Sequence, residues 1–206
     1  MGIRCWILGM LFAAHPMHLA GADIQVQVCN AVGAPEAEVR KALARAGWIL
    51  RQAGVEAHWS ECATSVRERT GVQDRGRQSR SEPFVVSILP EDPREGGSAD
   101  VLGFAVLAGR RNGAAVIYSR VISVLKENPD YADCNILGSV IVHELGHLLL
   151  RSPEHGEGIM RANWDRGEFE AMKQKRLKFS VAQARQMVAN VSLYNGAASL
   201  SEGGSK

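Results

Sequence analysis

The alternation of apolar and polar residues predicts a strand, a helix and a second strand at the start of the chain. Residues 24–28 and 55–59 alternate with a period of two, which is typical of strands covered on one face. Between them, residues 35–54 begin with a proline, carry apolar side chains at helical spacing and end with a glycine. His58 lies on the polar face of the second strand, so we expect it to be a solvated surface histidine.

The later pattern predicts three more strands and three helices. The strands are an apolar run between two prolines and the two arms of a hairpin, and one of the helices is apolar on every side. We place the strands at residues 84–89, 101–107 and 114–118, and the helices at residues 136–150, 165–176 and 180–194. Residues 63–82 are polar and arginine-rich, which predicts a solvated loop. We expect Asn128-Pro129 or Asp133 to cap the apolar helix.

The apolar helix contains three polar side chains that need a common partner. His143 and His147 are four residues apart and lie on one face, while Glu144 projects about 100° round the helix axis. The His-Glu-x-x-His spacing is that of zinc peptidases, in which the two histidines bind the ion and the glutamate is the general base. The alternative is a core helix whose histidines are only hydrogen-bonded.

A third metal ligand is expected because catalytic zinc usually has three protein ligands and a water. Pro153 cannot continue the helix, and His155 follows it, where the chain can fold back over the metal. We predict that His155 is the third ligand. Glu168 or Glu170, on the later short helix, is the alternative and would make the protein a gluzincin-type peptidase.

The His-Glu-x-x-His motif, the nearby third histidine and Met160 resemble the metzincin zinc endopeptidases. In that family the methionine lies in a tight turn beneath the metal, and Met160 matches it. The sequence departs from the family in two places. Leu150 stands where metzincins carry a glycine, and Pro153 stands where they carry the third histidine.

The resemblance extends to the order of the predicted elements and implies the fold class. This is an α+β (mixed α/β) fold with a twisted five-stranded sheet, four strands parallel and one edge strand antiparallel, with helices on one face. The resemblance also implies that residues 101–107 form the edge strand beside the cleft. A peptide or protein substrate would add to this edge as a further strand. Gly103 and Ala105 lie on one face of this strand, and their small side chains leave room for substrate or for the metal.

The predicted function is zinc-dependent hydrolysis of peptide bonds. Bound zinc lowers the pKa of water toward about 7 and polarises the scissile carbonyl, while Glu144 takes the proton and passes it to the leaving amine. Two other functions stay open: a non-catalytic secreted zinc-binding domain with a closed site, and a secreted structural domain without metal.

The N-terminal residues predict export. Residues 1–22 combine Arg4, a short apolar run and small residues at the end, which is the pattern of a signal peptide. We therefore expect a secreted or periplasmic protein without membrane attachment after cleavage. The mature chain would be one catalytic domain over residues 23–194 and a flexible tail over residues 195–206. The net charge of +2, without long charge blocks, gives no indication of nucleic-acid binding.

Three cysteines follow the predicted signal peptide: Cys29, Cys62 and Cys134. An odd number in an exported protein permits one intramolecular pair at most. Cys29 and Cys62 lie at the C-terminal ends of the first two predicted strands. If these strands are parallel neighbours, the two cysteines lie at the same end of the sheet. We predict that they form the bridge, with Cys134 as the competing partner.

Overall fold

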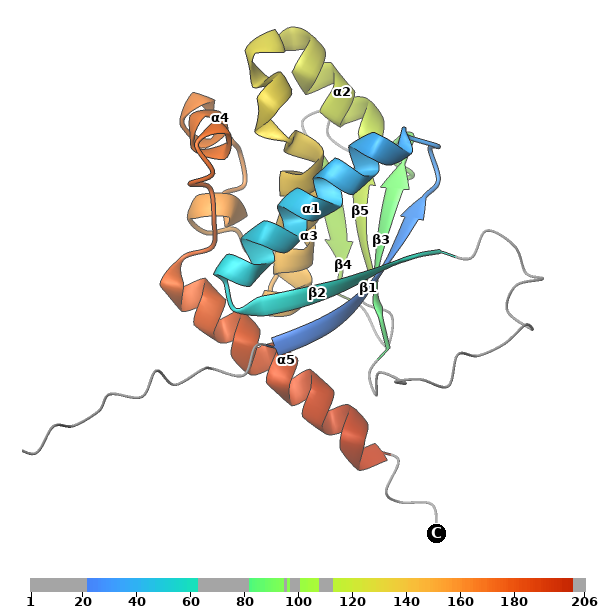
Figure 1. Cartoon of the computed structure of the whole chain (residues 1–206), viewed down its shortest axis with the longest axis vertical. Helices are drawn as coiled ribbons and strands as arrows, with labels where there is room; N and C mark the ends of the chain where they lie inside the picture. The colour runs from blue at the N-terminus through green and yellow to red at the C-terminus, as the bar shows by residue number, and fades with distance from the viewer. Residues whose placement is uncertain (1–21, 63–81, 95, 97–100, 108–112, 202–206) are drawn as a thin grey trace, which may run out of the picture.

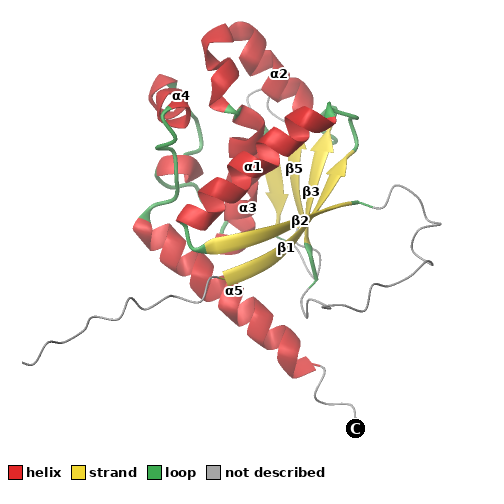
Figure 2. Cartoon of the chain, in the orientation of Figure 1, coloured by secondary structure: helices red, strands yellow, loops and turns green. Residues whose placement is uncertain are grey.

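The computed structural model describes residues 22–62, 82–94, 96, 101–107 and 113–201. Within these residues the chain forms one sheet with helices packed against it (Figures 1 and 2). Three predicted segments lie outside the described residues: the signal peptide apart from Ala22, nearly all of the polar loop 63–82, and the turn of the hairpin apart from Gly113. No helix in the described part is long and apolar enough to cross a membrane.

The sheet has five strands in the order β2-β1-β3-β5-β4. β2, β1, β3 and β5 are parallel to their neighbours, and β4 runs antiparallel to β5 at one edge. The strands are β1 (Ala22–Asn30), β2 (Val55–Glu61), β3 (Phe84–Leu89), β4 (Gly103–Val106) and β5 (Gly113–Ile117). The predicted mixed sheet with its antiparallel edge strand is confirmed.

Five α-helices and two short 3-10 helices are present in the described residues. They are α1 (Glu36–Gln52), α2 (Tyr118–Glu127), η2 (Pro129–Cys134), α3 (Ile136–Leu150), η3 (Gly158–Met160), α4 (Arg166–Lys173) and α5 (Val181–Ser201). α1 and α3 pack against each other and on the sheet (Figure 1). Ile24, Val26 and Val28 of β1 are buried in this core, whereas the residues between them are half-buried. The alternation in the sequence therefore reflects a face of the sheet that the helices cover.

α3 is buried along its whole length. Asn135 caps it, with a φ of 50° and a side chain that accepts the N–H of Gly138. The caps predicted at Asn128-Pro129 or Asp133 are wrong, because these residues lie at or within η2, which precedes the helix. At the other end, Arg151 has a φ of 55°, and this left-handed residue ends the helix two residues before Pro153.

Several elements differ from the predicted ones, among them α2, α5 and the start of β1. α2 occupies residues that the hydrophobic pattern left unassigned, and only Val121 within it is buried. α5 continues to Ser201, so the tail predicted from residue 195 begins as helix. Ala22 is the first residue of β1 and donates its N–H to Gly54 O at 3.1 Å. Signal cleavage directly after Ala22 would therefore remove one paired residue from the sheet.

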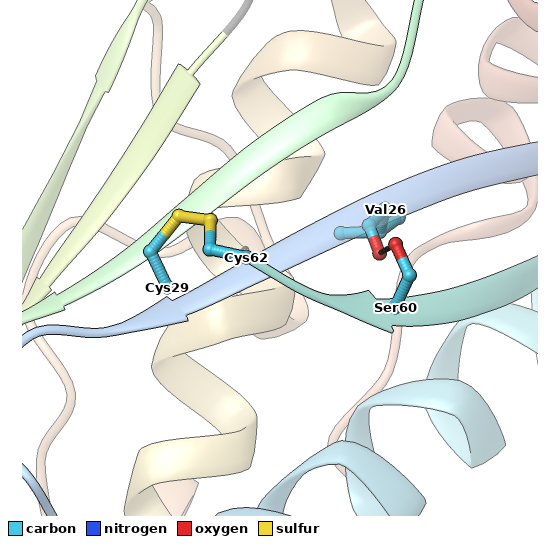
Figure 3. Close-up of a disulfide and its surroundings, with 4 residues drawn as sticks. All are labelled: Val26, Cys29, Ser60 and Cys62. Atoms are coloured by element: carbon cyan, nitrogen blue, oxygen red, sulfur yellow. Dashed lines mark hydrogen bonds between the residues drawn. A yellow bond between two sulfur atoms is a disulfide. The ribbon is translucent and has the colours of Figure 1, made fainter. Parts of the chain in front are cut away.

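Cys29 and Cys62 form a disulfide that joins the ends of β1 and β2 (Figure 3). The two strands are parallel neighbours, and Val28 lies opposite Glu61, so the cysteines that follow meet at the same end of the sheet. In the same pair of strands, the hydroxyl of Ser60 donates to Val26 O at 3.5 Å. The predicted pairing is confirmed. The predicted surface position of His58 is also confirmed, since its side chain is 52% exposed beside Asp23.

Candidate metal centre

Three histidines converge beside the C-terminal half of α3. The Nε2 atoms of His143 and His147 are 3.2 Å apart. One ligand atom from each of His143, His147 and His155 lies within 4.8 Å of the others. His143 and His147 are buried on α3, and His155 is exposed on the segment that follows it. The chain therefore folds back after α3 and brings His155 to the pair, as predicted.

Backbone carbonyls fix the orientation of the two helical histidines. Nδ1 of His143 lies 2.7 Å from Ile159 O, and Nδ1 of His147 lies 2.9 Å from Ser152 O. A carbonyl only accepts, so each Nδ1 is the donor and each Nε2 carries a lone pair. These two carbonyls therefore fix the tautomers of His143 and His147.

The donor set fits a zinc ion. Burial lowers the pKa of His143 to about 4 and also lowers the pKa of His147, so both rings are neutral near pH 7. Two neutral rings that aim lone pairs at each other across 3.2 Å repel unless a cation lies beside them. Neutral imidazoles at this spacing, with a third histidine in reach, are the ligands that zinc prefers.

Glu144 lies in the same cleft, against the edge strand. It is 5% exposed, and burial raises the pKa of its carboxyl to about 8, while the charge of Arg94 acts in the opposite direction. A Cβ on Gly103 would lie 2.9 Å from Oε1 of Glu144 and 2.6 Å from Ala115 O. The space that the sequence left for substrate beside Gly103 is thus occupied by the glutamate, and a glycine is required there for close packing.

Met160 lies in the 3-10 turn η3, directly after Ile159, whose carbonyl accepts from His143. It is 1% exposed, and its carbonyl accepts the N–H of Gly156 at 2.8 Å. A Cβ on Gly146 would clash with Met160 Sδ. Sequence reasoning did not single out Trp164, whose ring packs edge-on to His143 with centroids 5.6 Å apart. The Trp164 indole nitrogen is buried without a hydrogen-bond partner in the described residues.

Neither alternative ligand lies in the histidine cluster. Glu168 accepts from Arg161 Nη1 at 2.8 Å and completes the capping box of α4 with Asp165. Glu170 lies 3.5 Å from Lys173 Nζ. The three histidines, without either glutamate, make up the cluster found in the described residues.

A cleft of about 890 Å³ opens over the site, and β4 forms one of its walls. Ile117 donates its N–H to Leu102 O at 2.8 Å, and the register places these two residues directly opposite each other. Residues of an antiparallel pair alternate between bonding to the neighbour and pointing away from it. The backbone groups of Gly103 and Ala105 therefore point away from β5, toward the open edge of the sheet.

Comparison with known proteins identifies the fold. No family model and no curated protein matches the sequence. The crystal structure of archaemetzincin from Methanopyrus kandleri matches with a TM-score of 0.52 and 18% identity, over 84% of this chain and 97% of that chain. The fold is that of archaemetzincin. This likeness confirms the predicted metzincin-like architecture, and the chemistry of this archaemetzincin-like chain is inferred from its own residues.

Proposed function

We propose that this protein is a secreted zinc-dependent endopeptidase of the metzincin type. The observation that carries the proposal is the convergence of three histidine ligand atoms within 4.8 Å of one another, next to Glu144, in a cleft bordered by a strand edge. His143, His147 and His155 would hold the ion. Zinc, when bound, supplies a Lewis acid that polarises the scissile carbonyl and makes water more acidic.

Glu144 would be the general base. It would accept a proton from the attacking water and pass it to the leaving amine. Its pKa of about 8 in the absence of metal suits a group that both takes and gives a proton near neutral pH. A cation held by the adjacent histidines would lower the pKa of Glu144 and so favour its ionised form. The ionised carboxylate is the form that accepts the proton from water.

The substrate would lie along β4 as an extended chain. The outward N–H and C=O groups of Gly103 and Ala105 offer the bonding pattern of a further strand, and both residues line the cleft. Main-chain bonding of this kind holds any extended peptide, so the side-chain preference would come from the cleft walls.

Export to an oxidising compartment is part of the proposal. The signal-like residues 1–22 motivate it, and the Cys29–Cys62 bridge supports it, because such bridges persist in secreted and periplasmic proteins. Mass spectrometry of the protein recovered outside the cytoplasm would give the cleavage point, and an intact N-terminus on cytoplasmic protein would contradict export.

The deciding experiment compares wild type with Glu144→Gln in metal content and in digestion of a broad peptide library. We expect about one zinc per chain in both proteins, and hydrolysis at least about 100-fold slower in the variant. Zinc binding without hydrolysis by the wild type would favour a non-catalytic zinc-binding domain. Full zinc occupancy in His143→Ala or His147→Ala would show that the metal lies elsewhere.

The same assay tests the third ligand. His155→Ala should weaken zinc binding strongly, because it removes one of three protein ligands. Glu168→Ala and Glu170→Ala are the matched controls and should leave zinc binding unchanged. The reverse result would make the protein a gluzincin-type peptidase.

A further inference from the structure

Arg94 lines the cleft beside β4, and several contacts hold its guanidinium. Its Nε donates to Asp92 Oδ1 at 2.9 Å, its Nη2 donates to Asp92 Oδ2 at 2.7 Å, and its backbone N–H donates to the same carboxylate. The guanidinium carbon lies 4.1 Å from the ring centroid of Phe104 on β4. The bidentate ion pair with Asp92 and the contact with the Phe104 ring together fix the plane of the guanidinium.

This guanidinium still has a free donor edge that borders the cleft. Asp92 engages Nε and Nη2, and Nη1 has no hydrogen-bond partner in the described residues. The Arg94 side chain is 43% exposed, whereas the Asp92 side chain that holds it is 6% exposed. Arg94 lines the same cleft as Glu144, and its charge lowers the pKa of that glutamate. Its free edge is therefore within electrostatic range of the proposed catalytic site.

Two further positive groups lie near Arg94. Arg120, in the first turn of α2, also lines the cleft, and its charge helps to lower the pKa of Asp92. α2 begins there with no acidic residue in its first turn, so the positive end of its dipole is not offset within the helix. Glu91 is exposed nearby, and Glu127 lines the cleft at the other end of α2.

We propose that Arg94, with Arg120 beside it, binds a carboxylate of the peptide in the cleft, and that the enzyme prefers acidic substrates. This inference rests on the proposed function. Arg94 packs on Phe104, next to Gly103, and Glu144 packs against Gly103. The recognised carboxylate therefore lies within a few residues of the scissile bond. It belongs either to an aspartate or glutamate side chain or to the C-terminus of the peptide, since a guanidinium binds both in the same way.

Binding to the zinc-loaded Glu144→Gln variant tests the proposal without turnover. In one series, the dye-labelled peptides have amidated C-termini and come in pairs. The two members of a pair carry Glu or Gln at the same position, and this position differs from pair to pair. A second series without acidic side chains compares the free C-terminal acid with the amide. We expect about 10-fold tighter binding, or more, of the acidic member at one position of one series. The series that shows the preference identifies the source of the carboxylate.

Substitution of Arg94 then tests whether this residue causes the preference for acidic peptides. In the zinc-loaded Glu144→Gln protein, Arg94→Gln should bring the ratio of the affinities for acidic and neutral peptides to about one. An effect of the substitution that weakens both affinities equally leaves this ratio unchanged. Arg94→Lys should keep part of the preference, because lysine retains the charge but not the forked geometry. Arg51→Gln is the matched control, since Arg51 is 51% exposed and pairs with Glu56 outside the cleft.

Equal binding of acidic and neutral peptides, no peptide binding at all, or a preference that survives Arg94→Gln would overturn the inference. If Arg94→Gln does not fold, Arg94→Lys should lower the acid-to-neutral affinity ratio without abolishing it, and an unchanged ratio in that variant would overturn the inference. Hydrolysis is scored separately with wild type on the best-bound peptide. Acid-selective binding without hydrolysis would reject the proposed endopeptidase function and leave the carboxylate site standing.

Discussion

At the scale of single residues, burial sets the charge of the groups in the cleft. Glu144 and His143 are 5% and 7% exposed on a helix that is otherwise almost entirely apolar. Burial raises the pKa of Glu144 to about 8 and lowers the pKa of His143 to about 4. Without a bound cation both side chains are mostly neutral near pH 7, and ionising Glu144 destabilises the folded protein.

Metal-free protein should therefore lose stability as the pH rises from 7 to 9. The pKa of Glu144 is about 8 in the folded state and 4.5 as the reference value, so the folded state binds more protons between these values. The stabilisation is complete below pH 4.5 and is lost as the pH rises through 8. We expect the free energy of unfolding to fall by about 1–2 kcal/mol between pH 7 and 9, measured by denaturant unfolding with a chelator present.

Glu144→Gln is the control for this titration. The variant lacks the ionising group, so its free energy of unfolding should change less over the same range. His143 does not interfere, because its lowered pKa makes it titrate below pH 7. An equal decline in both proteins would assign the pH dependence to another residue.

Gly103 should control the position of the catalytic carboxylate. In Gly103→Ala the new Cβ must displace Glu144 or the β4 backbone, because it would lie 2.6 Å from Ala115 O and 2.9 Å from Oε1 of Glu144. We expect about 10–100-fold lower kcat with zinc retained, since a displacement of about 1 Å can cost 100-fold. Gly113→Ala is the matched control in the neighbouring strand, where the nearest atom would be 3.8 Å away. Equal kcat values in the two variants would refute the positioning role.

At the scale of elements, β4 is the part of the sheet that remains available to a partner. β5 pairs with it on one side, and no other strand pairs with it in the described residues. Val106 and Leu107 at its end are 46% and 38% exposed, which adds apolar surface beside the open edge. An edge with outward backbone groups and partly apolar side chains suits addition of a substrate strand.

Proline scanning of β4 should separate substrate binding from folding. Ala105→Pro removes an outward N–H, so we expect about 10-fold lower kcat/KM, mainly through KM, with zinc and secondary structure retained. Phe104→Pro removes a donor that faces β5, so it should also lower the melting temperature, in addition to removing the ring that packs against Arg94. Kinetics on extended peptides and thermal melts check both. Full activity of Ala105→Pro would show that substrate binds elsewhere.

The elements that could be predicted are those whose signal is local in the sequence. The His143–His147 spacing lies within one helix, and the buried face of β1 follows from simple alternation. α2 was missed because it buries little, and the cap of α3 was missed because Asn135 adopts a left-handed conformation that no pattern reports. The contacts of Gly103 and Arg94 with the cleft join elements far apart in sequence, so no local signal predicts them.

At the scale of the whole molecule, the disulfide and the proposed active site lie at opposite edges of the sheet. The Cys29–Cys62 bridge ties β1 to β2, which is one edge strand, and the histidine cleft borders β4, which is the other. β3 and β5 lie between them. The bridge should therefore stabilise the fold without shaping the cleft.

The double variant Cys29→Ser/Cys62→Ser should be less stable than wild type but equally active at temperatures where it stays folded. The bridge closes a loop with a sequence separation of 33, for which chain entropy gives about 3–4 kcal/mol of free energy of unfolding. Denaturant unfolding and kcat/KM on one peptide measure the two effects. Cys134→Ser is the matched control and should leave stability near that of wild type, because it keeps the bridge intact. A bridge containing Cys134 in the unreduced peptide map, or loss of zinc from the double variant, would contradict the separation of stability from catalysis across the sheet.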